Sequence, residues 1–185
     1  MTPRDRWPLY AVAGASVFAL AFLATRKVQT MVNDNSIAVQ NSWDGLTPEF
    51  RAKLSQLVAA LEARGFKPWV YETTRSRARQ DWLYASGRTR PGPIVTDVDG
   101  SYQSTRGHGS GTAADVIDGR PHPTRQGQRV GWGSWTGDPG DEEAAEMAQQ
   151  YFKAQGEEAK RLGLVWGGDW TLSGGGDDRP HVQLA

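Results

Sequence analysis

The sequence predicts an α+β domain in which a small antiparallel sheet is flanked by helices. Segments with helical periodicity are interspersed with short segments rich in aromatic and β-branched residues, within residues 46–185. These segments do not follow the strict strand–helix–strand alternation that builds parallel sheets. An uncharged stretch and a polar linker precede them, so we divide the chain into residues 1–27, 28–45 and 46–185.

An apolar segment occupies residues 7–24, and basic residues bracket it on both sides. Its length lies at the lower edge of what spans a bilayer, where about 20 apolar residues are typical. We predict a hydrophobic helix that is a cleaved secretory signal ending near residues 19–21, a permanent membrane anchor, or a weak anchor that later leaves the membrane. A buried core helix is the remaining alternative, and the bracketing charges argue against it.

The first helix of the domain is predicted to begin at Pro48. Thr47 is a suitable N-cap, and proline suits the first helical position. Apolar residues then recur at helical spacing and form one face: Phe50, Leu54, Leu57 and Leu61. Gly65 suits the position after the last turn, where a left-handed backbone is common.

A strand and a second helix are predicted next. Residues 66–72 are rich in aromatic and β-branched side chains and predict a strand. Pro68 favours an edge position, because proline has no N–H to donate to a neighbouring strand. Ser76 can cap a helix that continues to Ser86 and ends at Gly87.

The middle of the domain is predicted to be mostly loop. A glycine- and proline-bearing loop runs through about Gly107. Residues 112–118 predict a short buried strand, and residues 119–140 are again predicted to be loop.

The C-terminal part is predicted to contain one helix and two strands. A charged amphipathic helix begins at Asp141 and ends near Gly163, with Gly156 as a weak point inside it. Residues 164–166 and 181–184 predict the last two strands, on either side of a glycine-rich turn.

Composition excludes several classes of function. Lysine plus arginine and aspartate plus glutamate both total 21, so a net charge of zero gives no electrostatic case for nucleic-acid binding. The absence of cysteine excludes disulfides, thiolate metal sites and cysteine nucleophiles. We therefore expect no nucleic-acid partner, and we expect the chain to act as a monomer.

The few histidines restrict the metal chemistry that the chain can support. His108 is followed seven residues later by Asp115, and His181 is preceded three residues earlier by Asp178. A catalytic zinc site uses three protein ligands and one open position, with an unbound carboxylate nearby as general base. His108, Asp115 and His181 could be the ligands and Asp178 the base. The spacing of these residues alone is also consistent with a structural role, as a hydrogen-bonded polar pair in a loop and an aspartate that acts as a cap.

Three sequence blocks occur in a fixed order. They are VYETTRSRARQDWLYASGRT at 70–89, RGHGSGTAADVID at 106–118, and LGLVWGGDW followed by DDRPHVQL within 162–184. The middle block fits the pattern His-x-x-Gly-x-Ala-x-Asp. Together the blocks resemble peptidase family M15, the D-Ala-D-Ala metallopeptidase and VanY-like superfamily. The last block is most similar to L-alanyl-D-glutamate endopeptidases, which include bacteriophage endolysins.

The resemblance implies a Hedgehog/DD-peptidase-like fold and a role for each site residue. The family's zinc ligands fall on His108, Asp115 and His181, and its catalytic acid falls on Asp178. The family's arginine, which polarises the scissile carbonyl and stabilises the oxyanion, falls on Arg75. A surface salt bridge is the alternative role for this arginine.

Four other polar features lead to weaker expectations. Gln80 matches a position that is commonly polar in the family, although an exposed helix glutamine fits equally well. His122 matches no family element, and its two flanking prolines predict an exposed loop. Residues 97–100, DVDG, lack the other ligands of a calcium loop and predict a turn. Asp169 is predicted either to contact substrate or to cap a turn.

The resemblance implies a zinc-dependent peptidoglycan endopeptidase that hydrolyses the L-alanyl-D-glutamate bond. Peptidoglycan lies outside the cytoplasmic membrane, so the apolar segment at 7–24 implies an exported enzyme, tethered to the membrane or released. This arrangement is similar to the signal-anchor-release endolysins of bacteriophages. Two alternatives stay open: a D,D-carboxypeptidase of the same superfamily, and a non-catalytic cell-wall-binding module.

Overall fold

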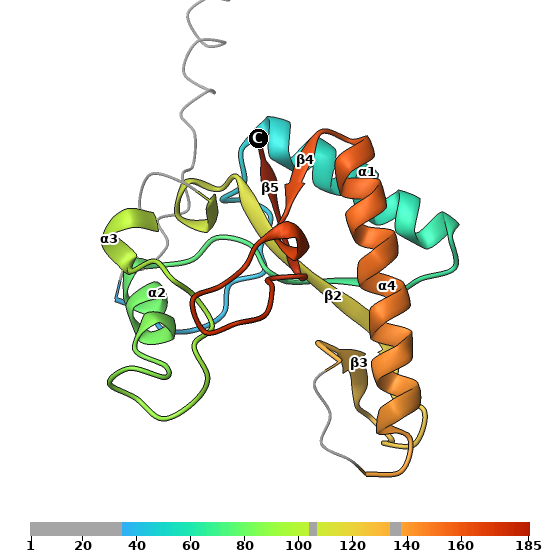
Figure 1. The fold of residues 1–185 in the computed structure, drawn as a ribbon. Coiled ribbons are helices and arrows are strands. Elements are labelled where there is room, and N and C mark those ends of the chain that lie inside the picture. The colour runs from blue at the N-terminus through green and yellow to red at the C-terminus, as the bar shows by residue number, and fades with distance from the viewer. Residues whose placement is uncertain (1–34, 104–106, 134–137) are drawn as a thin grey trace, which may run out of the picture.

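The computed structural model describes residues 35–103, 107–133 and 138–185 (Figure 1). The predicted hydrophobic helix at 7–24 lies outside the described residues. Among the helices of the described ranges, none is long and apolar enough to cross a membrane.

A five-stranded antiparallel sheet forms the centre of the domain (Figure 1). Its strands are β1 (Pro68–Glu72), β2 (Ala113–Pro121), β3 (Arg129–Gly131), β4 (Leu164–Trp166) and β5 (His181–Leu184). The strand order is β1-β2-β5-β4, and β3 also pairs with β2. The prediction of an α+β domain with a small antiparallel sheet is therefore confirmed.

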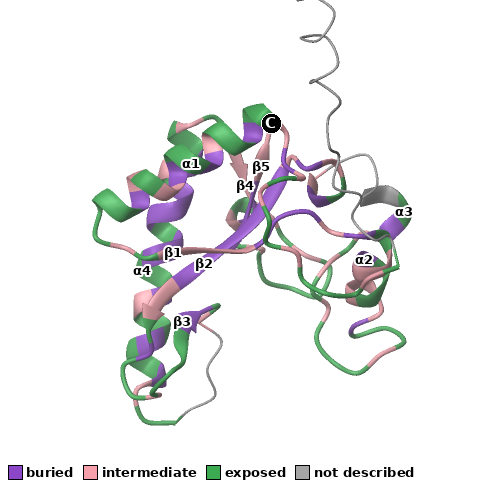
Figure 2. Ribbon diagram, turned by 180° about the vertical axis from the view of Figure 1, so that it is seen from behind, coloured by how far each residue is buried: buried purple, intermediate pink, exposed green. Residues whose placement is uncertain are grey.

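Helices lie on both sides of this sheet. They are α1 (Pro48–Ala63), α2 (Arg77–Tyr84), α3 (Gly100–Gln103), α4 (Asp141–Arg161) and the 3-10 turns η1 (Gly107–Ser110) and η2 (Gly167–Asp169). The long helices α1 and α4 lie together on one side, and the short helices α2 and α3 lie on the other (Figure 1). Seen from behind, α1 and α4 are buried where they face β2 and exposed on their outer surfaces (Figure 2).

The predicted starts of α1 and α2 are confirmed, whereas β1 begins at Pro68 instead of residue 66 and α2 ends at Tyr84 instead of Ser86. The Thr47 side chain accepts a hydrogen bond from the Phe50 N–H at 3.3 Å, and the apolar face of α1 is buried. The Ser76 side chain accepts from the Arg79 N–H at 3.0 Å and so caps α2. β1 is an edge strand, as Pro68 predicts.

Alternate side chains of β2 point to opposite faces of the sheet. Asp118 is buried beside α4: its carboxylate accepts from Arg120, which also donates to the Met147 carbonyl on that helix. Asp115 and Ile117 therefore lie on the opposite face, the one turned toward α2. This alternation places Asp115 on the face of β2 opposite Asp118.

The prediction of continuous loop over residues 119–140 is wrong. β2 continues to Pro121, and its end pairs with the short strand β3, with Asp118 opposite Gly131 and Pro121 opposite Arg129. This pairing depends on contacts with the sheet, and the local sequence, rich in glycine and proline, gives no periodic signal for it.

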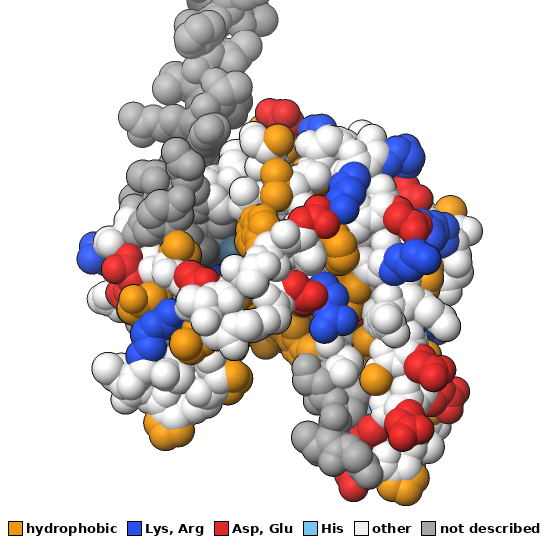
Figure 3. Space-filling model, in the orientation of Figure 1, with side chains coloured by type: hydrophobic (Ala, Val, Ile, Leu, Met, Phe, Trp, Pro, Cys, Tyr) orange, Lys and Arg blue, Asp and Glu red, His pale blue; other side chains and the backbone are white. Residues whose placement is uncertain are grey.

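The last predicted helix, α4, is continuous from Asp141 to Arg161 and runs through Gly156. A Cβ at position 156 would lie 2.6 Å from the ring of Trp166, so glycine allows that ring to pack against the helix. The charges of α4 stabilise it further: acidic residues occupy its first turn and basic residues its last. The acidic group is visible at one end of the helix (Figure 3).

Candidate metal centre and active site

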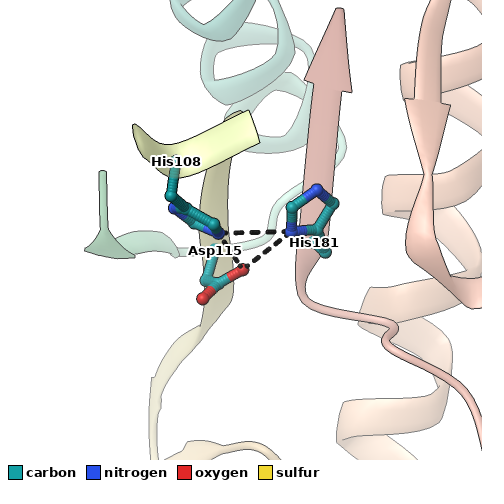
Figure 4. A group of neighbouring side chains, drawn as sticks. All are labelled: His108, Asp115 and His181. Atoms are coloured by element: carbon teal, nitrogen blue, oxygen red, sulfur yellow. Dashed lines mark hydrogen bonds and ion pairs between the residues drawn. The ribbon is translucent and has the colours of Figure 1, made fainter. Parts of the chain in front are cut away.

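His108, Asp115 and His181 meet on the face of the sheet that is turned away from α4 (Figure 4). Asp115 on β2 is paired directly with His181 on β5, and His108 lies in η1, just before β2. The His108 Nε2 lies 3.1 Å from the Asp115 Oδ1 and 3.2 Å from the His181 Nδ1. The His181 Nδ1 lies 3.4 Å from the same carboxylate oxygen. All three side chains are buried.

Glycine at two positions allows η1 to bring His108 back over β2. Gly107 and Gly111 have φ values of 57° and 71°, in the left-handed region that favours glycine. A Cβ on Gly111 would lie 2.1 Å from the carbonyl oxygen of Gly45, so a larger residue would displace this contact. The small residues of the HGSGTAAD segment thus place the histidine and the aspartate on one side of the turn.

Each of the two histidines has an outer ring nitrogen, the one that does not face the cluster. The partner of this outer nitrogen decides which of the two ring nitrogens carries a proton. The His108 Nδ1 lies 2.5 Å from the carbonyl oxygen of Thr73, which can only accept. The His181 Nε2 lies 3.1 Å from the Oε1 of Gln183, which also can only accept. In neutral rings the protons therefore sit on these outer nitrogens, and the inner nitrogens present lone pairs.

Two imidazole lone pairs and one carboxylate oxygen thus converge on a single point. Three acceptors without a donor repel one another, and a cation between them removes that repulsion. Ligands about 2.0–2.1 Å from a tetrahedral zinc ion lie about 3.3–3.4 Å from each other. The separations of 3.1, 3.2 and 3.4 Å are close to this spacing, so the residues fit a zinc ion.

The electrostatics of the cluster also suit a cation. Burial and the neighbouring Arg75 charge lower the pKa of His108, which favours the neutral ring that a metal needs. Burial would raise the pKa of Asp115, but His108, His181 and Arg75 hold it well below its usual range. Burial would lower the pKa of His181, but the hydrogen bond to Asp115 and the charges of Asp115 and Asp178 together raise it.

Arg75 lies directly beside the cluster rather than on the surface, so its predicted alternative, a surface salt bridge, is wrong. Its Nη2 is 2.8 Å from the Asp115 Oδ2 and 2.6 Å from the Glu72 Oε2. Its Nη1 donates to the Gln80 Oε1 at 2.9 Å, and its backbone N–H bonds to the His108 carbonyl at 3.3 Å. The side chain is only 10% exposed, so this charge is held in place.

Two of these partners were not evident from the sequence. Glu72 ends β1, is buried, and also accepts from Arg79 at 3.2 Å; a carboxylate three residues before Arg75 was its only sequence signal. Gln80 is completely buried and donates to the Thr96 hydroxyl and the Val98 carbonyl. The alternative of an exposed helix glutamine is therefore wrong for Gln80.

Glu72→Ala is expected to destabilise the domain by roughly 3–5 kcal/mol, because the largely buried Arg79 loses its carboxylate partner and Arg75 keeps only Asp115. Urea denaturation of wild type and variant measures this difference. Glu62→Ala, at an exposed position of α1, is the matched control and should change the free energy of unfolding by less than about 0.5 kcal/mol. A variant as stable as wild type would show that this ion-pair network does not stabilise the domain.

Asp178 is held just before β5, close to the ligand His181. Its N–H bonds to the Gly167 carbonyl at 3.0 Å, and its carbonyl accepts from the His181 N–H at 3.0 Å. Burial and the Asp115 charge raise the pKa of Asp178 to about 6, against the opposing effects of His181 and Arg75. A carboxyl group with a pKa near neutrality can both take up and release a proton.

One cavity of about 420 Å³ connects these groups. Asp115, Arg75 and Asp178 all line it, together with side chains from α2 and from the loops around residues 95 and 175. The structure thus brings together all five residues for which the sequence predicts a role in the site.

Three other polar residues lie outside this cluster. His122 is buried, not exposed as predicted: its Nδ1 accepts from the N–H groups of Thr124 and Arg125, and its Nε2 lies 3.5 Å from Asp141. Asp169 pairs with Lys160 at 2.8 Å on the surface. In the predicted turn at residues 97–100, the Asp97 carboxylate accepts from the N–H of Ser173 in the glycine-rich turn.

The sequence matches a known protein family and is similar to individual known proteins. Residues 100–184 match the group of peptidase family M15 that is described as D-alanyl-D-alanine carboxypeptidase. The chain is 30% identical over 145 residues to the peptidoglycan L-alanyl-D-glutamate endopeptidase CwlK of Bacillus subtilis strain 168. This similar region covers 75% of this chain and 73% of that protein. The chain belongs to peptidase family M15. The L-alanyl-D-glutamate peptidase of Listeria phage A118 is 28% identical over 139 residues, 75% of this chain.

The chain spans only 38% of the length of the phage relative. It spans a larger share, 73%, of the Bacillus protein. Membership of this metallopeptidase family agrees with a His–Asp–His cluster that could hold a metal ion.

Proposed function

We propose that this M15 peptidase is a zinc-dependent peptidoglycan endopeptidase that hydrolyses the L-alanyl-D-glutamate bond of the stem peptide. The observation that carries the proposal is the convergence of three metal-ligand lone pairs beside Arg75 and Asp178 in one cavity. The substrate is suggested by the two relatives, which are both named for this bond.

His108, Asp115 and His181 would hold the zinc ion. When bound, the ion would acidify a water molecule and polarise the carbonyl of the scissile bond. Thr73 and Gln183 bond to the outer ring nitrogens and so keep the inner nitrogens directed at the ion.

Asp178 would act as the proton carrier. Its pKa of about 6 allows the carboxylate to take a proton from the attacking water and to pass it to the leaving amine. The hydrogen bonds of its backbone to Gly167 and His181 hold it at a fixed place relative to the ligands.

Arg75 would stabilise the negative charge that develops on the carbonyl oxygen. A guanidinium group has five N–H donors. Within the described part of the chain, bonds to Glu72, Gln80 and Asp115 engage Nε, Nη2 and one N–H of Nη1. One N–H of Nη1 is left over for an oxygen of the substrate, and the surrounding carboxylates keep the group from moving.

We also propose that residues 46–185 form the peptidase domain, residues 28–45 a linker, and residues 1–27 the segment that exports or tethers it. The uncharged stretch at 7–24 supports this, because peptidoglycan lies across the membrane from the site of synthesis. Sequencing the N-terminus of the protein from fractionated cells, over time, distinguishes a cleaved signal, a permanent anchor and a released anchor.

Removal of the metal is expected to abolish hydrolysis of purified peptidoglycan, because the ion would supply the acidified water and polarise the scissile carbonyl. The loss of turbidity of a wall suspension measures the reaction with and without a chelator, and added Zn²⁺ should restore it. Undiminished lysis by protein shown to be metal-free would contradict the proposal. A wall-binding module would sediment with the wall but leave its turbidity unchanged.

A D,D-carboxypeptidase is the second candidate, because the matched M15 group carries that description. The two activities release different products. A carboxypeptidase would liberate free D-alanine from pentapeptide stems, whereas the proposed endopeptidase would liberate none.

A further inference from the structure

Three aromatic side chains form a row beside the candidate active site, and we call Trp69, Tyr71 and Trp132 the aromatic row. The Trp69 and Tyr71 rings on β1 are 5.7 Å apart at 84°, and the Tyr71 and Trp132 rings are 5.1 Å apart at 77°. Arg129 lies over the Trp69 ring, 4.6 Å from its centroid. Such edge-to-face contacts fix the orientation of each ring.

The aromatic row is open to solvent at its Trp132 end. The Trp132 side chain is 43% exposed although it follows directly after β3 and contacts Tyr71. A second cavity, of about 370 Å³, lies along the row and is lined by Trp69, Tyr71 and Trp132, by Ile117 and by the residues of β3. A rigid, partly exposed aromatic wall of this kind suits a ligand with an apolar face.

The second cavity adjoins the active-site cavity. Tyr71 and Trp132 line both of them. Trp69 is paired with Ile117 on β2, two residues from Asp115 on the same face of the sheet. A ligand that extends from the reacting bond along β1 would therefore reach the aromatic row.

We propose that the aromatic row binds the N-acetylated sugar to which the stem peptide is attached. This inference rests on the proposed function. In peptidoglycan the L-alanine is the first residue of the stem, linked to the sugar through its lactyl group. Because one extended residue spans only about 3.3–3.6 Å, the sugar must lie against a wall of the active-site cavity.

The charges around the active-site cavity indicate which wall this is. Besides Tyr71 and Trp132, the lining of this cavity includes Arg79, Asp177 and Arg179, which suit the carboxylates and amine of the remaining stem. The sugar is uncharged and presents C–H groups on one face, and these pack well on aromatic rings. The row and the charged walls thus fit the two ends of one substrate.

The experiment compares the hydrolysis of two substrates by the Trp132→Ala variant. One substrate is a muropeptide that carries its sugar, and the other is the free stem peptide with L-alanine at its N-terminus. For the muropeptide, KM is expected to rise roughly tenfold, equivalent to about 1.4 kcal/mol, with kcat unchanged. The free peptide should be hydrolysed as by wild type. Trp132→Phe should restore most of the affinity. The control is Ile37→Ala, which changes an exposed apolar side chain outside both cavities and should alter the hydrolysis of neither substrate. Equal effects on both substrates, or none, would overturn the inference.

Binding of peptide-free glycan strands tests the row without catalysis. Titration followed by tryptophan fluorescence should show saturable binding that Trp132→Ala abolishes. If the protein hydrolyses the free peptide but binds no glycan, the aromatic row has another role and the proposed function stands. If it hydrolyses neither substrate yet binds glycan through Trp132, the proposed function fails and the sugar site stands.

Discussion

Asp178→Asn is expected to lower kcat on purified peptidoglycan by about 10²- to 10⁴-fold, the usual contribution of a general base or acid. The amide keeps the size of the side chain but cannot take up the proton of the attacking water. Since Asp178 forms none of the three contacts of the ligand cluster, the variant should bind zinc as wild type does.

Turnover of muropeptides and metal content by mass spectrometry test this together. Asp169→Asn is the matched control, because that carboxylate pairs with Lys160 on the surface and lies outside the active-site cavity. It should keep wild-type kcat. An Asp178→Asn protein with wild-type turnover would show that another group carries the proton.

His181→Ala is expected to lose both bound zinc and activity. The change removes one of two neutral ligands and also leaves Asp115 without the partner that lies directly opposite it on β5. Loss of an outer partner of a ligand already costs about 10- to 100-fold in affinity, so loss of the ligand itself should exceed this range.

His122→Ala is the control that the chain offers for this experiment. His122 is buried like His181, but it accepts from the Thr124 and Arg125 N–H groups near the start of α4. Its loss should lower the melting temperature and leave the zinc content and the activity per folded molecule unchanged. Retention of zinc by His181→Ala would remove this histidine from the metal site.

The local features of the fold were predictable, and the long-range ones were not. The caps at Thr47 and Ser76 and the apolar spacing of α1 operate within a few residues, so the sequence displays them directly. Strand β3 exists through its pairing with the end of β2, and Gly156 is explained by the Trp166 ring that packs on it. Neither contact has a periodic signature in the chain.

The same distinction applies to the candidate site. His108, Asp115 and His181 belong to short motifs that resemble family M15, and their spacing alone did not decide between a metal site and a polar loop. Glu72 and Gln80 act through contacts with Arg75, so only the folded chain shows their part in the site. His122 was predicted to be exposed because prolines flank it, but it is buried beside Asp141, the first residue of α4.

Mass spectrometry of purified peptidoglycan digested by the protein, with the metal content measured in parallel, tests the central claim most directly. We predict stem fragments with a new N-terminal D-glutamate, produced only by protein that contains zinc. Release of terminal D-alanine with the L-alanyl-D-glutamate bond intact, or unchanged muropeptides after incubation with zinc-loaded protein, would contradict it.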